Sequence, residues 1–137
     1  MRNVWLVLLC CIFQSQAQNK LEIDIENITV SQGTLVISIF NSAKSFDQNE
    51  VQEGFFQKIV VGSPQLQVVF ENLPTGRYAI KAYHDANDNQ KLDKTWMGIP
   101  KESYGFSNNI MGIMAPPSFE QSAFEVDSNT QHTLILR

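Results

Sequence analysis

The sequence predicts an all-β protein: an antiparallel β-sandwich of the immunoglobulin-like or transthyretin-like kind, with about seven strands and one long irregular loop region. Short apolar segments recur along the chain, separated by Gly, Pro or Asn/Asp residues, which is typical of strands joined by turns. After the N-terminal segment, no long window has a convincing helical stripe of apolar positions. Without helices to cross over between parallel neighbours, antiparallel pairing is favoured.

The N-terminal segment has the pattern of a secretory signal peptide. Arg2 provides a positive start, Val4 to Phe13 contains no charge, and small residues stand at Ser15 and Ala17. The apolar run is about half of the ~20 residues that a membrane helix needs. We therefore expect a signal peptide at residues 1–17, no membrane span after its cleavage, and an exported protein that is periplasmic or secreted. Residues 18–137 are then a single β-sandwich domain.

Charge and cysteine content exclude two classes of function. Ten Lys and Arg against fourteen Asp and Glu give a net charge of −4 and a pI near 5.0, so the chain has no electrostatic basis for gripping a phosphate backbone. We expect no nucleic-acid partner. Both cysteines, Cys10 and Cys11, lie in the signal segment, which leaves the predicted domain without disulfides or sulfur-based zinc sites.

The strands are predicted from their periodicity. Leu21, Ile23 and Ile25 alternate with acidic residues, so a first strand with one buried face starts here and is expected to run on toward Val30. Thr34 to Phe40 is nearly continuously apolar, as in a central strand covered on both faces. Five further strands are predicted: Phe55 to Val61, Leu66 to Glu71, Arg77 to His84, Ala123 to Val126 and Thr133 to Leu136.

The sequence predicts the local structure of two connections between strands more specifically. Phe46 to Phe56 is the best helix candidate, but Gly54 interrupts it, and we expect one short turn at most. In the turn before the strand that starts at Arg77, Pro74 presets φ and Gly76 is expected to accept a positive φ. The hydroxyl of Tyr78 is expected to fold back onto the backbone of this turn, which is a structural role.

The segment after His84 has the spacing of a calcium loop. Oxygen-bearing side chains stand at Asp85, Asn87, Asn89 and Asp93, which are positions 1, 3, 5 and 9 of such a loop, and Lys91 would contribute its backbone carbonyl from position 7. Alternate oxygens around a tight turn can encircle a hard cation. Calcium is the only cofactor that the sequence indicates.

Two positions depart from the usual calcium loop. Gln90 stands where glycine permits the sharp bend, and Trp96 stands where a bidentate Glu is usual, so Glu102 would have to fold back as a replacement ligand. With two charged ligands, Asp85 and Asp93, the expected affinity is weak, roughly 10⁻⁴ to 10⁻³ M. The alternative is a loop whose Asn and Asp side chains only cap their own backbone.

Three aromatic residues follow the loop: Trp96, Tyr104 and Phe106. They would bind a sugar or a protein if exposed, but we favour packing against the sandwich, the usual location of large apolar side chains. If the protein is an enzyme, the sequence favours a hydrolase that uses His84 with Asp85 or Glu102 as acid and base. A zinc site is disfavoured because the chain has only one other histidine, at position 132.

Four motifs follow one another along the chain: Leu73-Pro74-Thr75-Gly76-Arg77-Tyr78-Ala79-Ile80, His84-Asp85-x-Asn87-x-Asn89-x-x-Leu92-Asp93, Gly98-Ile99-Pro100-x-Glu102-x-Tyr104-Gly105-Phe106-Ser107-Asn108 and Pro117-x-Phe119-x-x-x-Ala123-Phe124. In this order they resemble the bacterial family known as domain of unknown function 2141 (DUF2141). The resemblance covers nearly all of residues 18–137. It implies a small exported protein of Gram-negative bacteria, with no activity assigned, and family members often have glycine where this chain has Gln90.

We therefore favour a non-enzymatic binding or accessory module, stabilised by calcium in the Asp/Asn-rich loop, over an enzyme. The candidate ligands are Asp85, Asn87, Asn89, Lys91, Asp93 and Glu102. A carbohydrate- or protein-binding module that uses the loop aromatics stays open as an alternative, as does a small hydrolase that uses His84. The expected partner is a protein or carbohydrate of unknown identity.

Overall fold

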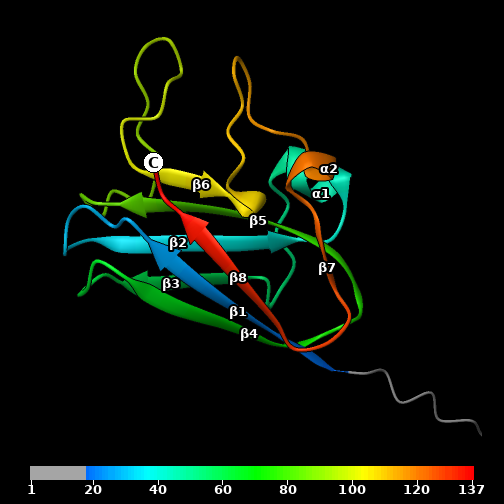
Figure 1. Ribbon diagram of the computed structural model, residues 1–137. Coiled ribbons are helices and arrows are strands. Elements are labelled where there is room, and N and C mark those ends of the chain that lie inside the picture. The colour runs from blue at the N-terminus through cyan, green and yellow to red at the C-terminus, as the bar shows by residue number, and fades with distance from the viewer. Residues whose placement is uncertain (1–17) are drawn as a thin grey trace, which may run out of the picture.

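The structure is a computed structural model that describes residues 18–137, so the predicted signal peptide at residues 1–17 lies outside the described residues. Two β-sheets face one another (Figure 1). The first has the strand order β4-β1-β8, and the second has the order β3-β2-β5-β6, with β7 also pairing with β5. The strands are β1 (Asn19–Glu26), β2 (Thr34–Phe40), β3 (Phe56–Val60), β4 (Leu66–Leu73), β5 (Gly76–Asp85), β6 (Tyr104–Phe106), β7 (Phe124–Val126) and β8 (Thr130–Ile135). The predicted all-β sandwich is confirmed, and each of the seven predicted strands has a counterpart.

The pairing is antiparallel with one exception. Strand β1 lies antiparallel to β4 but parallel to β8, so the chain ends beside the strand with which the domain begins. The prediction that the first strand runs on toward Val30 is wrong, because β1 ends at Glu26. Asn27 follows with a left-handed φ of 65°, and its side-chain amide donates to the Leu136 carbonyl at 2.7 Å.

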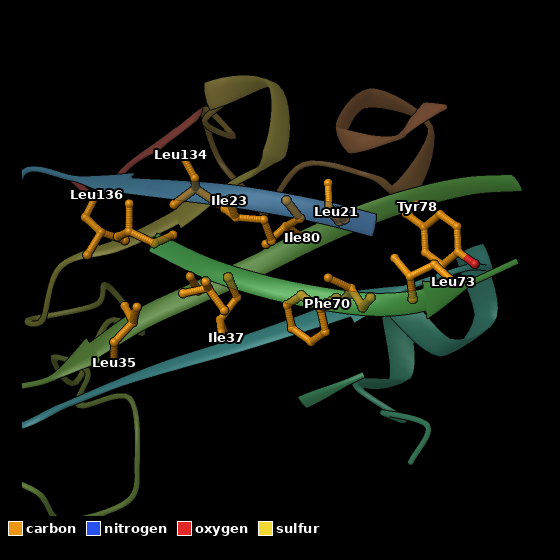
Figure 2. Close-up of a cluster of buried hydrophobic side chains, with 14 of the residues drawn as sticks. Leu21, Ile23, Leu35, Ile37, Phe70, Leu73, Tyr78, Ile80, Leu134 and Leu136 are labelled. Atoms are coloured by element: carbon orange, nitrogen blue, oxygen red, sulfur yellow. The ribbon is translucent and has the colours of Figure 1, made fainter. Parts of the chain in front are cut away.

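The main core lies between the two sheets. Alternate residues of β1 are fully buried, namely Leu21, Ile23 and Ile25, and they pack in one cluster with Ile37 of β2 and Ile80 of β5 (Figure 2). Such alternation places one face of each strand in the core and the other in solvent. Burial of these side chains is the main source of stability for a domain without disulfides.

Tyr78 closes one end of this core. It is 2% exposed, and its hydroxyl donates to the Pro74 carbonyl at 2.8 Å, which confirms the role predicted for it. The prediction of a positive φ at Gly76 is wrong. The left-handed residue of this connection is Asn72, with φ 59°, two residues before the proline.

A second apolar cluster covers the opposite face of the larger sheet. Helices α1 (Ala43–Gln48) and α2 (Phe119–Ser122) contribute Phe46 and Phe119, which pack with Phe40 and Phe106. Strand β2 therefore has both faces buried, as predicted. Helix α1 begins before the predicted Phe46, because the hydroxyl of Ser42 accepts the Ser45 N–H at 3.2 Å and caps it there.

Strand β6 joins the two sheets at one corner. The N–H and C=O of Tyr104 pair with the C=O and N–H of Arg137, at 3.0 and 2.9 Å. A Cβ on Gly105 would lie 2.8 Å from Leu134 and 3.0 Å from the Ile135 carbonyl, so glycine permits the close approach of β6 to β8. This corner holds the long segment between β5 and β7 against the sandwich. Among residues 18–137, no helix is long and apolar enough to cross a bilayer.

Candidate metal site in the loop after β5

Asp85, the last residue of β5, anchors the candidate loop. It is 2% exposed, and each of its carboxylate oxygens accepts a backbone N–H from the loop: Oδ1 from Asn89 at 3.1 Å and Oδ2 from Gln90 at 2.7 Å. A buried carboxylate is tolerated only when its oxygens are hydrogen-bonded in this way. Position 1 of the predicted calcium loop therefore lies at the centre of the turn.

The side chains of the other predicted positions converge on Asp93. The side-chain amide of Asn87 donates to Asp93 Oδ2 at 2.8 Å, and that of Asn89 donates to both Asp93 oxygens at 2.9 Å. The Oδ1 atoms of Asn87 and Asn89 accept the N–H groups of Asn89 and Lys91, at 3.1 and 3.0 Å. Each amide oxygen has a second lone pair, which is available to a cation.

These hydrogen bonds act on the charge of Asp93. The side-chain amides of Asn89 and, next, Asn87 hold the pKa of the Asp93 carboxyl below its ordinary value, and the more distant Lys101 and Lys91 act in the same direction. Asp93 is thus ionised at neutral pH, as a calcium ligand must be.

Glu102 folds back onto the loop, as the sequence allowed. Its Oε1 accepts the Ala86 N–H at 3.1 Å and its Oε2 accepts the Asp93 N–H at 3.0 Å, so one carboxylate joins the two ends of the loop. Burial, followed by the charges of Asp85 and Glu102, raises the pKa of the nearby Tyr83. The site therefore collects negative charge at the end of β5.

Two of the seven non-glycine residues with a positive φ in residues 18–137 lie in this loop. Gln90 has φ 64° and Asp88 has φ 55°, although neither is glycine. The left-handed backbone conformation costs a non-glycine residue on the order of 1–2 kcal/mol of free energy, and this cost applies to Gln90 at the bend of the loop. The hydrogen bonds to Asp85 and Asp93 offset this strain.

Sequence reasoning missed the residues that support the loop from the sheet. Thr34 donates its hydroxyl to Asp88 Oδ1 at 2.7 Å, and Gly33 approaches the Asp85 carbonyl so closely that a Cβ would lie 2.3 Å from it. A cavity of about 300 Å³ beside the loop is lined by Thr34, Val36, Lys58, Asp85, Asp88 and Gln90. Gly33, the glycine before β2, was the only local sign in the sequence of a close approach to the loop. The contact of Thr34 with Asp88 depends on the pairing of β2 with β5, which the sequence does not reveal.

No salt bridge within residues 18–137 involves a residue of the loop. Salt bridges there join Lys20 to Glu22 and Arg77 to Glu120 and Glu125, all outside the loop. In the same residues, no three His, Cys, Asp or Glu side chains cluster as a metal site. The candidate ligands predicted from the sequence are instead a mixture of carboxylate and amide oxygens, a set of the kind that calcium accepts.

The two histidines have separate structural contacts. His84 is 2% exposed, with its Nε2 2.6 Å from the Gln32 carbonyl. His132 lies on the other sheet, where it stacks on Phe124 with ring centroids 4.4 Å apart. Its Nε2 accepts the Asn108 N–H at 3.1 Å, and burial lowers its pKa. The structure therefore does not bring the two rings together.

The three loop aromatics differ in location. Phe106 is buried and Tyr104 is partly buried. Their rings pack edge to face, with the ring centroids 6.0 Å apart. Packing is confirmed for this pair. For Trp96 the prediction of packing is wrong: its side chain is 93% exposed, and the residue belongs to the loop between β5 and β6, which projects from the end of the sandwich (Figure 1).

Comparisons with known proteins give one match. The family model described as an uncharacterized protein conserved in bacteria (DUF2141) matches residues 23–133, which includes every strand except the ends of β1 and β8. No curated protein and no solved structure matches this chain. The chain belongs to the DUF2141 family of bacterial proteins.

Proposed function

We propose that the protein is an exported, non-enzymatic β-sandwich module whose Asp85 to Asp93 loop binds calcium. The observation that carries this proposal is the convergence of Asn87 and Asn89 on the Asp93 carboxylate, in a turn organised by Asp85. A binding module of this kind uses the ion to hold the following loops in one arrangement.

The chemistry of the loop supports calcium over other ions. Hard oxygen donors and flexible geometry suit calcium, whereas zinc favours nitrogen and sulfur ligands. In the hydrogen-bonded loop, the side-chain amides of Asn87 and Asn89 supply positive partial charge to Asp93. A cation entering the turn would replace them and use the free lone pairs of Asn87 and Asn89. Glu102 then keeps the two ends of the loop together.

A second candidate function is protein or carbohydrate binding through the loop aromatics. The exposed indole of Trp96 supports binding, but Phe106 is buried and does not form a stacking platform with it. The hydrolase alternative has less support. His84 is buried against the Gln32 carbonyl, so its ring does not reach a substrate in this arrangement.

Thermal unfolding of residues 18–137 in EDTA, calcium and magnesium tests the calcium proposal. Ligand binding to the folded state adds RT ln(1 + [L]/Kd), so calcium at tenfold Kd adds about 1.4 kcal/mol and raises the midpoint by several degrees. Asp93→Asn keeps the shape of the side chain and should abolish the calcium shift. Asp127→Asn, in the turn between β7 and β8, should keep it. Equal shifts with magnesium, or an unchanged response in Asp93→Asn, would contradict the proposal.

A further inference from the structure

Two loops, between β5 and β6 and between β6 and α2, project from the same end of the sandwich (Figure 1). Each exposes large apolar side chains. The first tip exposes Trp96 at 93% and Met97 at 62%, and the second exposes Ile113 at 101% and Met114 at 98%. Single exposed apolar residues are ordinary, but four on two adjacent tips form a surface that needs a partner.

The two tips belong to one surface, because they line the same hollow. A cavity of about 420 Å³ lies between the loops, and its walls include Met97 and Ile99 from the first loop and Ile113 and Met114 from the second. Tyr104 and Phe106 of β6 also line this cavity. The apolar tips thus stand on either side of a shared gap above β6.

The projecting loops are built as defined turns. In the first, the N–H of Thr95 donates to the Ile99 carbonyl at 2.7 Å, and the N–H of Gly98 donates to the Thr95 carbonyl at 2.9 Å. In the second, a Cβ on Gly112 would lie 1.5 Å from the Ala115 carbonyl oxygen, so only glycine permits this turn. Preformed tips lose little conformational entropy when they bind.

Exposed charge near the tips is mostly positive, although the rest of the domain is acidic. From residue 85 to residue 117, the exposed charged side chains are Lys91, Lys94 and Lys101 against Asp88. The other three carboxylates, Asp85, Asp93 and Glu102, accept hydrogen bonds from the loop itself. The remainder of residues 18–137 has six Lys and Arg against ten Asp and Glu. An acidic domain therefore presents exposed lysines beside its apolar tips.

We propose that this end binds the surface of a bilayer containing anionic lipid, with the four apolar side chains of its two tips inserted and the lysines among the headgroups. Lipid chains are fluid and can adapt to two separate protruding tips. Tryptophan, in addition, favours the membrane–water interface. Lysines beside an apolar insert add attraction to anionic lipid. The chemistry disfavours a sugar, since Trp96 is the single aromatic ring among the four exposed side chains of the tips. This proposal does not depend on calcium, because it rests on the exposed apolar side chains of the tips and on the neighbouring lysines.

The test uses the protein from Gln18 onward, which contains both cores and every described strand. Trp96 is its only tryptophan, since Trp5 lies in the predicted signal segment, so intrinsic fluorescence reports on the first tip itself. In EDTA, vesicles of phosphatidylcholine with a quarter phosphatidylglycerol should shift its emission to the blue, and brominated lipid should quench it. Emission that stays at the wavelength of a water-exposed indole would overturn the proposal.

Variants distinguish vesicle binding through the tips from non-specific hydrophobic adsorption of the protein. Ile113→Ser with Met114→Ser, which leaves Trp96 intact, should weaken vesicle binding at least ~tenfold. The control is Val60→Ser on β3, which removes an 81% exposed apolar side chain away from the tips and should bind like the parent. Lys94→Gln with Lys101→Gln should weaken binding to the mixed vesicles.

Equal losses of vesicle binding in the Val60→Ser control, or self-association of the parent in place of vesicle binding, would contradict the assignment. Because the assay contains EDTA, its outcome is independent of the calcium proposal.

Discussion

The side-chain amide of Asn89 donates to both carboxylate oxygens of Asp93, at 2.9 Å each. This contact closes the turn that Asp85 starts, and the second amide from Asn87 completes it at 2.8 Å. The loop's own polar groups therefore hold its backbone in a turn. A calcium ion would replace the amide contacts to Asp93, while the backbone N–H groups on Asp85 keep the turn in place.

Asp85→Asn should destabilise the protein by about 1–3 kcal/mol even in EDTA, because one oxygen that accepts a backbone N–H becomes an NH₂ group facing it. Urea unfolding in EDTA measures this loss. Asp127→Asn, on the exposed turn after β7, serves as the control and should change stability by less than ~0.5 kcal/mol. Equal stability of Asp85→Asn and the parent would show that the loop is not anchored at this residue.

Gly33→Ala should be much more damaging than Gly54→Ala. Both glycines have a positive φ, 79° and 81°, so both substitutions cost about 1 kcal/mol in backbone strain. At Gly33 the new Cβ would also lie 2.3 Å from the Asp85 carbonyl oxygen and 2.8 Å from Ala86 Cα, whereas nothing lies within 4 Å at Gly54. We expect an additional loss of at least about 2 kcal/mol and a weaker calcium response. Similar unfolding midpoints for the two variants would refute this close packing.

Lys81 should stabilise the attachment of α1 to the larger sheet. Its ammonium donates to the Phe46 carbonyl and, at 2.7 Å, to Asn49 Oδ1, and it lies 4.0 Å from the centroid of the Phe46 ring. Burial lowers its pKa, and the charge of Asp47 opposes this effect. Lys81→Met keeps the aliphatic stem and should cost about 1–2 kcal/mol in chemical denaturation. Lys44→Met, on the exposed side of α1, should lower the free energy of unfolding by less than half as much. A larger loss in Lys44→Met than in Lys81→Met would show that the Lys81 amine contributes nothing.

Stability should fall as the pH drops below about 6.5. Burial lowers the pKa of His132 below this ordinary value, and its Nε2 must stay unprotonated to accept the Asn108 N–H. The unfolded chain then binds the proton more readily than the folded protein. The contribution is complete above pH 6.5 and is lost as the pH falls through the lowered folded value. His132→Gln keeps an acceptor and should flatten the dependence of urea midpoints measured down to pH 5, where most carboxylates stay ionised; an identical slope in the variant would assign the effect to other groups.

The sequence predicted those features that depend on local pattern. The alternation from Leu21 to Ile25, the continuous apolar run of β2 and the hydroxyl contact of Tyr78 are each encoded within a few residues. Oxygen spacing after His84 likewise predicted that Asn87, Asn89 and Asp93 come together.

Features that depend on distant partners were missed. Strand β6 has only three residues, and it exists because Tyr104 pairs both with β5 and with Arg137 at the end of the chain. The exposure of Trp96 depends on a loop that turns away from the sheets. Helix α2 had a usable local signal, the capping box of Ser118 and Gln121, but its four residues are too short for periodicity.

The central claim is that the loop from Asp85 to Asp93 is a calcium site, and the most direct measurement is a calcium titration of the nitrogen-15-labelled protein followed by amide chemical shifts. We predict saturable shifts for Asn87 to Lys91 and for Asp93 and Ala86, with an apparent Kd of roughly 10⁻⁴ to 10⁻³ M. Magnesium should leave these amides nearly unchanged. Absence of saturable shifts in this loop, or equal small shifts at all acidic positions of the surface, would contradict the account.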